Sequence, residues 1–549
     1  MDLTPTPKLL AFIFSMSAAL CGCSGGNFDA PRSFVSSSGG NAHGGMPGSS
    51  SNAYWIPVSE KPEAGAAGNN GVYVIPSNAI GTPPVALTPA TTNATLLTAQ
   101  NQSAGGGAVY APSLVMYYAT GPDNNVHVYG LDLTDTTGLP TPRQIGSLSL
   151  TPASGSSICL TTSALQNTSD PSTLFVILPI TGASGQCGAA DMDFELVNYT
   201  DSPSTPPTPL PYASVDITAL YQPDGQLGGL VTVSAGGQLV FYSAGRLAGE
   251  PTILVDPAPS FGMLAQTSDA QYFIVTNTNG DNPVIPQEFY VYRVTASGSA
   301  SKVYTSADMI GGGVTDANNL YITDTVVAIF TTIYQVSLTS GTVTPLYKVA
   351  ANGAVSLIGS TGSTLVFGYT GDYSSTISAI PVNVPSTSEK VLTNVPSSLF
   401  ATAFMDSSNT YLYANFIGLG ASSALTVALV VGTDQQLQAS SNSMFIQTGT
   451  TAGSPVLLLT GVSTESMGGG EIYQFDPANG SQTPITRIDG SPYTLPGTDF
   501  DGTFTAISSF GIGTFNMQDS IPPTFGAVYD VATHTIVPLS LNGVNVSVW

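Results

Sequence analysis

Residues 333–347 read Ile-Tyr-Gln-Val-Ser-Leu-Thr-Ser-Gly-Thr-Val-Thr-Pro-Leu-Tyr, and residues 472–486 repeat the pattern as Ile-Tyr-Gln-Phe-Asp-Pro-Ala-Asn-Gly-Ser-Gln-Thr-Pro-Ile-Thr. The two copies align without a gap, and Gly341 matches Gly480. Alternating apolar and polar residues on both sides of a glycine turn are typical of a β-hairpin. The proline of each return strand removes a backbone N–H, which an edge strand tolerates. Each copy therefore predicts a strand, a glycine turn and a return strand at the edge of a sheet.

The spacing of these hairpins predicts a repeat architecture. Tyr334 and Tyr473 are 139 residues apart, which gives about 46 residues for each of three units. A period of 40–50 residues with several strands in each unit is the signature of a β-propeller. Related hairpins begin near Val126, Asp193, Gln238, Phe289, Ile377 and Phe525, and weaker ones near Val72 and Leu425.

We therefore expect an all-β fold with a single β-propeller. The best count is eight blades, within a range of seven to ten, because the weaker units can be loops or part of a shared blade. Near the C-terminus, Val544, Val546 and Val548 alternate with polar residues. This segment predicts a last strand that pairs with the N-terminal part of the repeat domain.

Two short segments resemble known repeat families. Asp316-Ala-Asn-Asn-Leu-Tyr-Ile-Thr-Asp-Thr is similar to the first half of an NHL-type blade, and Tyr272-Phe-Ile-Val-Thr-Asn-Thr-Asn-Gly is similar to a YVTN-type blade. The Trp-bearing repeat of quinoprotein propellers is absent, since Trp55 and Trp549 are the only tryptophans. The resemblance implies propeller architecture and transfers no functional residue.

The N-terminus predicts export. Lys8 precedes an apolar run that ends at Leu20, which has the length of a signal-peptide core and is too short to span a bilayer. Leu20-Cys21-Gly22-Cys23 resembles the lipobox of bacterial lipoproteins, which implies that Cys23 carries the lipid, with palmitate among its acyl groups. The expected domains are a lipoprotein signal peptide at 1–22, a Gly/Ser-rich tether at 23–52 and the propeller-like repeat domain at 53–549.

Two other interpretations of the N-terminal segment stay open, namely an ordinary secretory signal and a buried N-terminal helix. If Cys23 is the lipidated residue, Ser24 follows it. This position lacks the Asp that resembles an inner-membrane retention signal in Gram-negative lipoproteins. The expected location is therefore the cell envelope, as an outer-membrane lipoprotein facing the periplasm or the cell surface.

Charge and cysteine content agree with export. Ten basic and 34 acidic residues give a net charge of −24, which repels nucleic acid and anionic lipid. A hydrophobic content of 42% excludes a largely disordered chain. Cys159 and Cys187 remain after removal of the signal and lipidation, and we expect them to form one disulfide. A metal site at these cysteines is the alternative, although no histidine lies near either one in sequence.

Catalytic motifs are scarce. His43 lies in the tether, while His127 and His534 lie in strand-hairpin segments, where we expect structural roles. No cofactor is predicted. Acidic residues in turn-like segments are candidate Ca²⁺ ligands, although the same segments are also ordinary turn formers. These candidates are Asp191, Asp193, Asp281, Asp499 and Asp501.

Three functions fit these observations. The favoured one is a non-enzymatic lipoprotein that is held at the membrane by its lipid and binds or scaffolds a protein or glycan. The alternative is an envelope hydrolase or lyase that uses carboxylate or metal chemistry at the propeller axis. A mainly structural envelope component is the third. A cluster of three or more carboxylates or a bound metal in the central channel favours the enzyme, whereas a dry channel lined by Ser and Thr, with exposed aromatic residues on one face, favours binding.

Overall fold

The computed structural model describes the chain in segments. They are residues 55–60, 71–88, 93–99, 115–120, 125–131, 133, 138–149, 163–166, 174–180, 193–199, 208–209, 217–221, 227–233, 237–243, 250–256, 260–267, 270–277, 288–326, 329–349, 355–371, 374–382, 389–406, 408–418, 424–433, 435–447, 456–461, 471–493, 503–505, 512–517, 525–530, 533–541 and 544–548.

The fold is all-β, as the hairpin pattern predicts. The described residues form forty strands and one 3-10 turn, Ser77–Ala79. Within these segments, no helix is long and apolar enough to cross a membrane. Every pairing between neighbouring strands in a sheet is antiparallel, with one exception between β4 and β8.

Six sheets contain four strands each, in the order of the chain. They are β12 (Ile217–Tyr221), β13 (Leu227–Val233), β14 (Leu239–Ser243) and β15 (Thr252–Val255); β16 (Ser260–Gln266), β17 (Ala270–Asn277), β18 (Glu288–Thr295) and β19 (Ala300–Ser306); β20 (Met309–Thr315), β21 (Asn319–Val326), β22 (Phe330–Ser337) and β23 (Val343–Val349); β24 (Val355–Ser360), β25 (Thr364–Thr370), β26 (Ser374–Pro381) and β27 (Lys390–Pro396); β28 (Ser398–Met405), β29 (Tyr411–Gly418), β30 (Ala424–Val430) and β31 (Gln436–Ser441); and β32 (Ser443–Gln447), β33 (Val456–Thr460), β34 (Ile472–Asp476) and β35 (Ser481–Pro484).

Two further sheets contain eight strands each. One has the order β11-β10-β9-β8-β4-β5-β6-β7, from β4 (Asn93–Ala99), β5 (Val115–Thr120), β6 (Asn125–Leu131), β7 (Arg143–Ser149), β8 (Ser163–Gln166), β9 (Leu174–Ile180), β10 (Asp193–Tyr199) and β11 (Thr208–Pro209). The other has the order β3-β2-β1-β40-β39-β38-β37-β36, from β1 (Trp55–Glu60), β2 (Val72–Pro76), β3 (Val85–Ala86), β36 (Thr503–Thr505), β37 (Ile512–Met517), β38 (Phe525–Asp530), β39 (Thr535–Leu541) and β40 (Val544–Val548).

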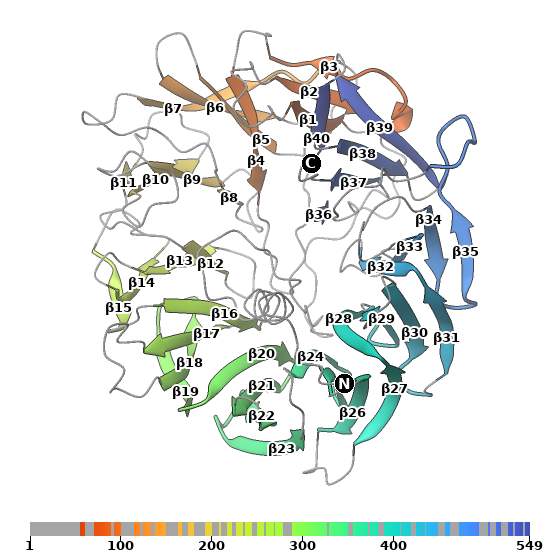
Figure 1. The fold of residues 1–549 in the computed structure, drawn as a ribbon. Helices are drawn as coiled ribbons and strands as arrows, with labels where there is room; N and C mark the ends of the chain where they lie inside the picture. Colours follow the sequence, from red (N-terminus) through yellow and green to blue (C-terminus); the bar gives the residue numbers. More distant parts are fainter. Residues whose placement is uncertain are drawn as a thin grey trace, which may run out of the picture.

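Figure 1 shows these sheets side by side in chain order around a common centre. In the four-stranded sheets the first strand lies nearest the centre and the fourth lies at the rim. The last strand pairs with the first, with Val58 opposite Val548 and Glu60 opposite Val546. This pairing was predicted from the alternating valines of the C-terminus, and it is confirmed.

The repeated hairpin has the predicted geometry in both copies. Tyr334 pairs with Pro345 in β22–β23, and Tyr473 pairs with Pro484 in β34–β35, so the register is identical. Gly341 and Gly480 close the two turns with positive φ angles of 69° and 73°, a conformation that costs glycine nothing. The two hairpins belong to sheets that are three places apart, as the spacing of 139 residues predicts.

The remaining predicted hairpins also coincide with strands. Each one contains or adjoins the third strand of a set of four successive strands, when β40 is counted as the first strand of the set that continues with β1, β2 and β3. Val72 lies in β2, Val126 in β6, Asp193 in β10, Gln238 next to β14, Phe289 in β18, Ile377 in β26, Leu425 in β30 and Phe525 in β38.

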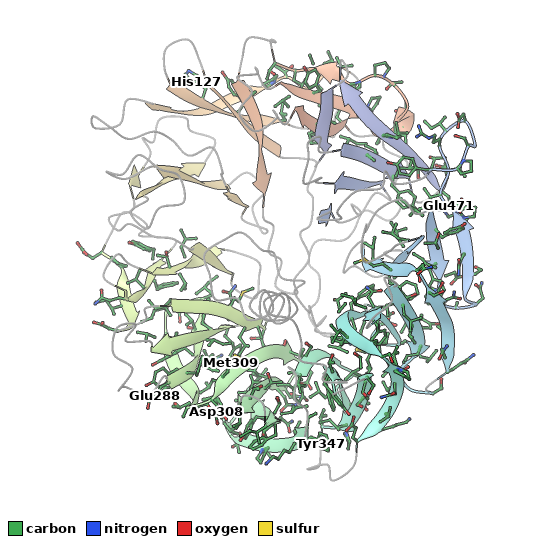
Figure 2. All side chains as sticks on the ribbon, in the orientation of Figure 1. His127, Glu288, Asp308, Met309, Tyr347 and Glu471 are labelled. Carbon is green, nitrogen blue, oxygen red and sulfur yellow. The ribbon has the colours of Figure 1, made fainter. Side chains whose placement is uncertain are left out.

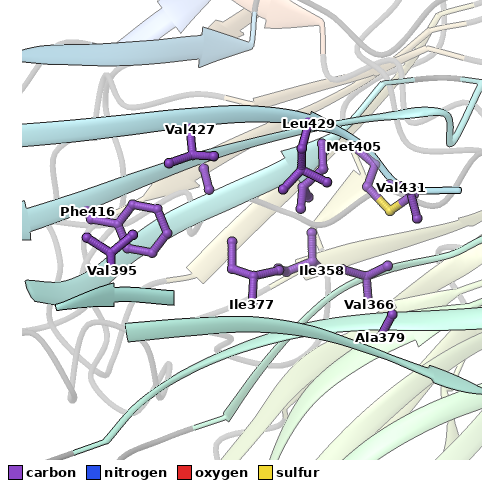
Figure 3. Packing of buried hydrophobic residues seen from close by; sticks show 12 residues of the cluster. Ile358, Val366, Ile377, Ala379, Val395, Met405, Phe416, Val427, Leu429 and Val431 are labelled. Carbon is purple, nitrogen blue, oxygen red and sulfur yellow. The ribbon is translucent and has the colours of Figure 1, made fainter. Parts of the chain in front are cut away.

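Central strands are buried on both faces, and successive residues contact opposite neighbours. In β21, Leu320 and Ile322 belong to the core shared with the preceding sheet, while Tyr321 belongs to the core shared with the following one. The next sheet repeats this alternation, because Phe367 of β25 packs against the preceding sheet and Val366 packs against the following one. Figure 3 shows the core between this sheet and the following one, where side chains of two adjacent sheets meet face to face.

The fourth strand of most sheets contains one extra residue. The pairing register skips a residue there, which defines a β-bulge and increases the local twist. The skipped residue is aliphatic in six of these strands: Ile145, Leu254, Val303, Leu346, Leu392 and Leu437. Leu346 is 3% exposed, so this bulge turns an apolar side chain into the core between sheets.

Polar side chains also join neighbouring sheets. The amide of Asn415 in β29 donates to the Phe445 carbonyl at 2.9 Å and accepts from the Phe445 N–H at 2.8 Å. Thr370 at the end of β25 accepts from the Phe400 N–H of β28 at 3.0 Å. These side chains satisfy backbone groups of a first strand that has no partner strand on its inner side, which removes the cost of burying them unpaired.

First strands approach one another closely enough to require glycine. A Cβ atom on Gly313 would lie 2.3 Å from the carbonyl oxygen of Leu264 in the neighbouring first strand. A Cβ atom on Gly359 would meet the Met405 sulfur at 2.6 Å, and that side chain is flexible.

We predict that Gly313→Ala lowers the free energy of unfolding by about 1–3 kcal/mol, because the clash with backbone forces two strands apart. Gly359→Ala should cost clearly less, since Met405 can change rotamer. Urea unfolding followed by fluorescence measures both variants. Equal stability of the two variants would contradict a backbone contact at Gly313.

Candidate functional site

Each set of four successive strands has two ends, and the chain makes different connections at each end. At the turn end, the chain passes from the first strand to the second and from the third to the fourth. At the loop end, it passes from the second strand to the third and from the fourth to the next sheet. β4 and β8 pair in parallel within one sheet, so the two sets of four strands that they begin place like ends on the same side. Ser375 at the start of β26 donates to the Ser398 carbonyl at the start of β28, which aligns two further loop ends.

The five predicted Ca²⁺ candidates all fall at the loop end in sequence order. Asp193 is the first residue of β10, a third strand, and Asp191 precedes it. Asp281 lies between β17 and β18, while Asp499 and Asp501 lie between β35 and β36. Their side chains are outside the described residues. They belong to connections of different sheets, and the topology does not bring them to one sheet.

Five carboxylates at the loop end are described. Two of them, Asp256 after β15 and Asp489 after β35, accept hydrogen bonds from Gln238 and Ser491. Glu288 begins β18, Asp308 lies between β19 and β20, and Glu471 precedes β34. Figure 2 places Glu288 and Asp308 in one sector of the ring and Glu471 in another. Among the described residues, no group of three His, Cys, Asp or Glu side chains is arranged to hold a metal ion.

The turn end uses its carboxylates differently. Asp406 accepts from the backbone N–H groups of Thr410 and Tyr411 at 2.8 and 2.7 Å, and Asp316 accepts from those of Asn318 and Asn319. These bonds close the turns between first and second strands, as Asp commonly does. Asp316 and Asp406 therefore have structural roles in these turns.

The strands nearest the centre contain a single ionisable side chain in their sequences, Tyr221 of β12. Their sequences are rich in Ser, Thr, Gly and aliphatic residues and contain no Asp, Glu, His, Cys, Lys or Arg. They are β4, β8, β12, β16, β20, β24, β28, β32, β36 and β40. General acid–base chemistry at the axis would therefore need groups from the connections between strands.

Two carboxylates that the sequence patterns did not single out lie between adjacent sheets. Glu389 accepts hydrogen bonds from Tyr347 of the preceding sheet at 3.0 Å, from Tyr369 at 2.9 Å and from Ser378. Asp324 is 8% exposed and accepts from Tyr304 of the preceding sheet at 2.5 Å. An acidic residue inside an apolar strand, as in Leu320–Asp324, is the signal that could have revealed Asp324.

These contacts raise the pKa of the tyrosines. Burial, with the hydrogen bond to Glu389 second, raises the pKa of Tyr347 to about 12. Burial and the hydrogen bond to Asp324 raise the pKa of Tyr304 in the same direction. Neutral tyrosines beside carboxylates are hydrogen-bond donors at physiological pH, so both pairs connect sheets without placing two charges together.

Two of the three histidines are described. His127 is half-buried in β6. His534 lies in the turn between β38 and β39 with a positive φ of 53°, and its Nδ1 is 2.9 Å from the Gln474 Oε1 of the neighbouring sheet. Tyr529 donates to the same Gln474 oxygen at 2.5 Å. His43 is outside the described residues.

The three cysteines with predicted roles also lie outside the described residues. Cys23, Cys159 and Cys187 have no described structure, so lipidation and the disulfide stay predictions. Cys159 precedes β8, and Cys187 lies in sequence between β9 and β10.

Comparison with known proteins gives weak likenesses. No family model and no curated protein matches the chain. Among solved structures, a prolyl endopeptidase from a study of two such enzymes is similar at 10% identity, covering 77% of this chain and 53% of that chain, with a TM-score of 0.36. TolB from Acinetobacter baumannii is similar at 11% identity, with 70% and 81% covered and a TM-score of 0.28. An oligogalacturonate lyase in complex with manganese is similar at 12% identity, with 86% and 96% covered and a TM-score of 0.33.

The prolyl endopeptidase and TolB are β-propeller proteins. The present chain spans about half the length of the prolyl endopeptidase. Identities and TM-scores of this size say nothing about activity. The description of the fold is based on the strand pairing given above.

We predict that alkaline pH weakens the contact between Tyr347 and Glu389. An unfolded tyrosine has a pKa near 10 and Tyr347 in the fold one of about 12, so this contribution to stability is complete below pH 10 and is lost as the pH rises through 12. The stability difference between wild type and Tyr347→Phe should therefore shrink between pH 9 and pH 12.

Urea unfolding at several pH values measures this difference. The double variant Tyr347→Phe/Glu389→Gln should cost less than the sum of the single variants, because the two residues share one bond. Strict additivity would contradict the contact.

Proposed function

We propose that this chain is a membrane-anchored extracytoplasmic lipoprotein whose β-propeller body binds or scaffolds a protein or glycan. Cys23 is the lipidated residue, residues 23–52 form the tether, and the loop end of the body is the binding surface. The cell envelope, on the outer membrane of a Gram-negative cell, is the proposed location.

The observation that carries this proposal is the chemistry of the first strands. In sequence, none of these strands contains a carboxylate, imidazole, thiol or basic side chain. Glycoside hydrolysis needs a pair of carboxylates across the scissile bond, and these strands offer none. The Ser- and Thr-containing strands at the centre support binding over axis catalysis.

Acidic side chains also lie at the loop end. Glu288 and Glu471 accept there from the hydroxyls of Tyr290 and Tyr473, and Asp489 closes a turn, as Asp316 and Asp406 do at the turn end. A partner with exposed basic groups or hydroxyl donors would be favoured there.

We also infer that the body has ten blades, at the upper limit of the range from the sequence. The forty strands divide into ten successive sets of four when β40 is counted with β1–β3. Each eight-stranded sheet joins two such sets through a two-residue pairing, Thr98 and Ala99 with Ser163 and Ala164 in one case, Ser540 and Leu541 with Asn545 and Val544 in the other. Cryo-electron microscopy of the purified body, viewed along the axis, counts the blades, and eight would contradict ten.

Capture from envelope extract tests the function. We expect the lipidated protein to retain a specific partner, and Glu288→Gln/Asp308→Asn/Glu471→Gln to release it. Glu250→Gln is the matched control, because Glu250 is exposed and lies in a turn-end connection. No retained partner, together with turnover of a glycan panel, would overturn the binding function in favour of the hydrolase or lyase.

The anchor has its own test in the same extracts. Cys23→Ala should move the protein from the membrane fraction to the soluble fraction, because a chain without lipid keeps no stable hold on the bilayer. Unchanged membrane retention of this variant would refute the lipidation of Cys23.

A further inference from the structure

Two tyrosines from adjacent sheets share one carboxylate. Tyr347 of β23 donates to Glu389 Oε2 at 3.0 Å, and Tyr369 of β25 donates to Glu389 Oε1 at 2.9 Å. Ser378 of β26 donates to the same Oε1 atom. These four residues, which we call the tyrosine–glutamate cluster, lie where the sheet of β20–β23 meets the sheet of β24–β27. Tyr347 is at the outer part of the ring (Figure 2).

Packing holds both tyrosine rings in place. Tyr347 and Tyr369 pack against the apolar core between the two sheets, and the ring centroid of Phe367 is 6.1 Å from that of each tyrosine. Ser378 is fully buried, whereas the two tyrosines and Glu389 are half-buried. The oxygens of the cluster are therefore positioned by the fold, in residues that stay partly open to solvent.

The spacing of these oxygens matches that of ligands around a small cation. Oxygen ligands about 2.0 Å from an octahedral cation are about 2.8 Å apart at adjacent corners. The two distances between phenol and carboxylate oxygens, 3.0 and 2.9 Å, are close to this value. A small cation can therefore replace the two phenolic protons with little movement of the side chains.

Charge selects the cation. Two phenolates and one carboxylate carry three negative charges, which balance a trivalent ion and attract it more strongly than a divalent one. Tyrosine is an established protein ligand of iron, as at some haem sites. The neighbouring Lys348 does not compete, because its ammonium lies 3.3 Å from the centre of the Phe330 ring. Its pairing with Thr332 places it on the opposite face of the sheet from Tyr347.

We propose that Tyr347, Tyr369 and Glu389 form a binding site for ferric iron at the boundary between two sheets. The two phenol oxygens and the carboxylate are the protein ligands, and two phenolic protons pass to solvent when the ion binds. Water completes the coordination. Ser378 is a positioning residue, because its hydroxyl holds Glu389 Oε1. This site needs neither the lipid anchor nor the partner of the proposed function.

Titration of the purified full chain with ferric nitrilotriacetate tests the iron site. We expect a phenolate-to-iron charge-transfer band in the visible spectrum and tyrosinate modes in the resonance Raman spectrum. Ser378→Ala should weaken the affinity about tenfold, the usual cost of losing a group that supports a ligand. Tyr347→Phe and Tyr369→Phe should each weaken it more, and the double variant should give no band.

Tyr473→Phe is the matched control. Tyr473 donates to Glu471 in another sheet, so this variant loses a contact between a tyrosine and a carboxylate outside the cluster. Its band and affinity should equal those of the wild type. Absence of the band in the wild type, or an equal band in Tyr347→Phe/Tyr369→Phe, would overturn the iron site.

Unfolding separates an iron site from a hydrogen-bonded bridge. An ion that binds only the folded chain stabilises it. Ferric nitrilotriacetate should therefore raise the urea midpoint of the wild type and of Tyr473→Phe, and leave that of Tyr347→Phe/Tyr369→Phe unchanged. Circular dichroism without iron shows that each variant is folded. The wild-type spectrum alone decides whether a phenolate binds iron, so an unfolded variant does not obscure the result.

Discussion

The burial of both faces of each central strand is the constraint on which the rest of this structure depends. A sheet with one apolar face can rest on a single core, but Leu320, Tyr321 and Ile322 are all fully buried in succession. Their side chains point alternately to opposite faces, so each sheet needs a neighbour on both sides. A row of such sheets leaves apolar faces at its two ends, and pairing of β40 with β1 brings the two ends of the chain into one sheet.

The rim of each sheet solves a second problem, because a fourth strand exposes an unpaired edge that can recruit other chains. This chain has only ten basic residues, yet Arg143, Lys302, Lys348 and Lys390 all lie in fourth strands. Prolines in the same strands, such as Pro345, and the aliphatic bulges further disrupt an edge. Basic residues at the edges discourage pairing between copies while the rest of the surface stays acidic.

Much of the fold could be predicted from the sequence because it is encoded locally. The hairpin register, Tyr334 with Pro345, follows from a glycine turn and from alternation, which need only neighbouring residues. The weaker hairpins were harder to predict, since the units at Val72 and Leu425 lack the Tyr-Gln pattern. Val72 nevertheless begins the third strand β2, because pairing with β1 and β3 compensates for a weak local signal.

The candidate site was less predictable, because its groups come from different sheets. Glu389 meets Tyr347 across a sheet boundary, and no spacing rule in a single hairpin relates the two residues. Asp316 and Asp406 close turns, but an Asp in a turn-like segment does not by its sequence distinguish a turn from a ligand site. The hydrogen bonds separate the two, because a carboxylate that closes a turn has its oxygens occupied by backbone N–H groups and cannot offer them to another molecule.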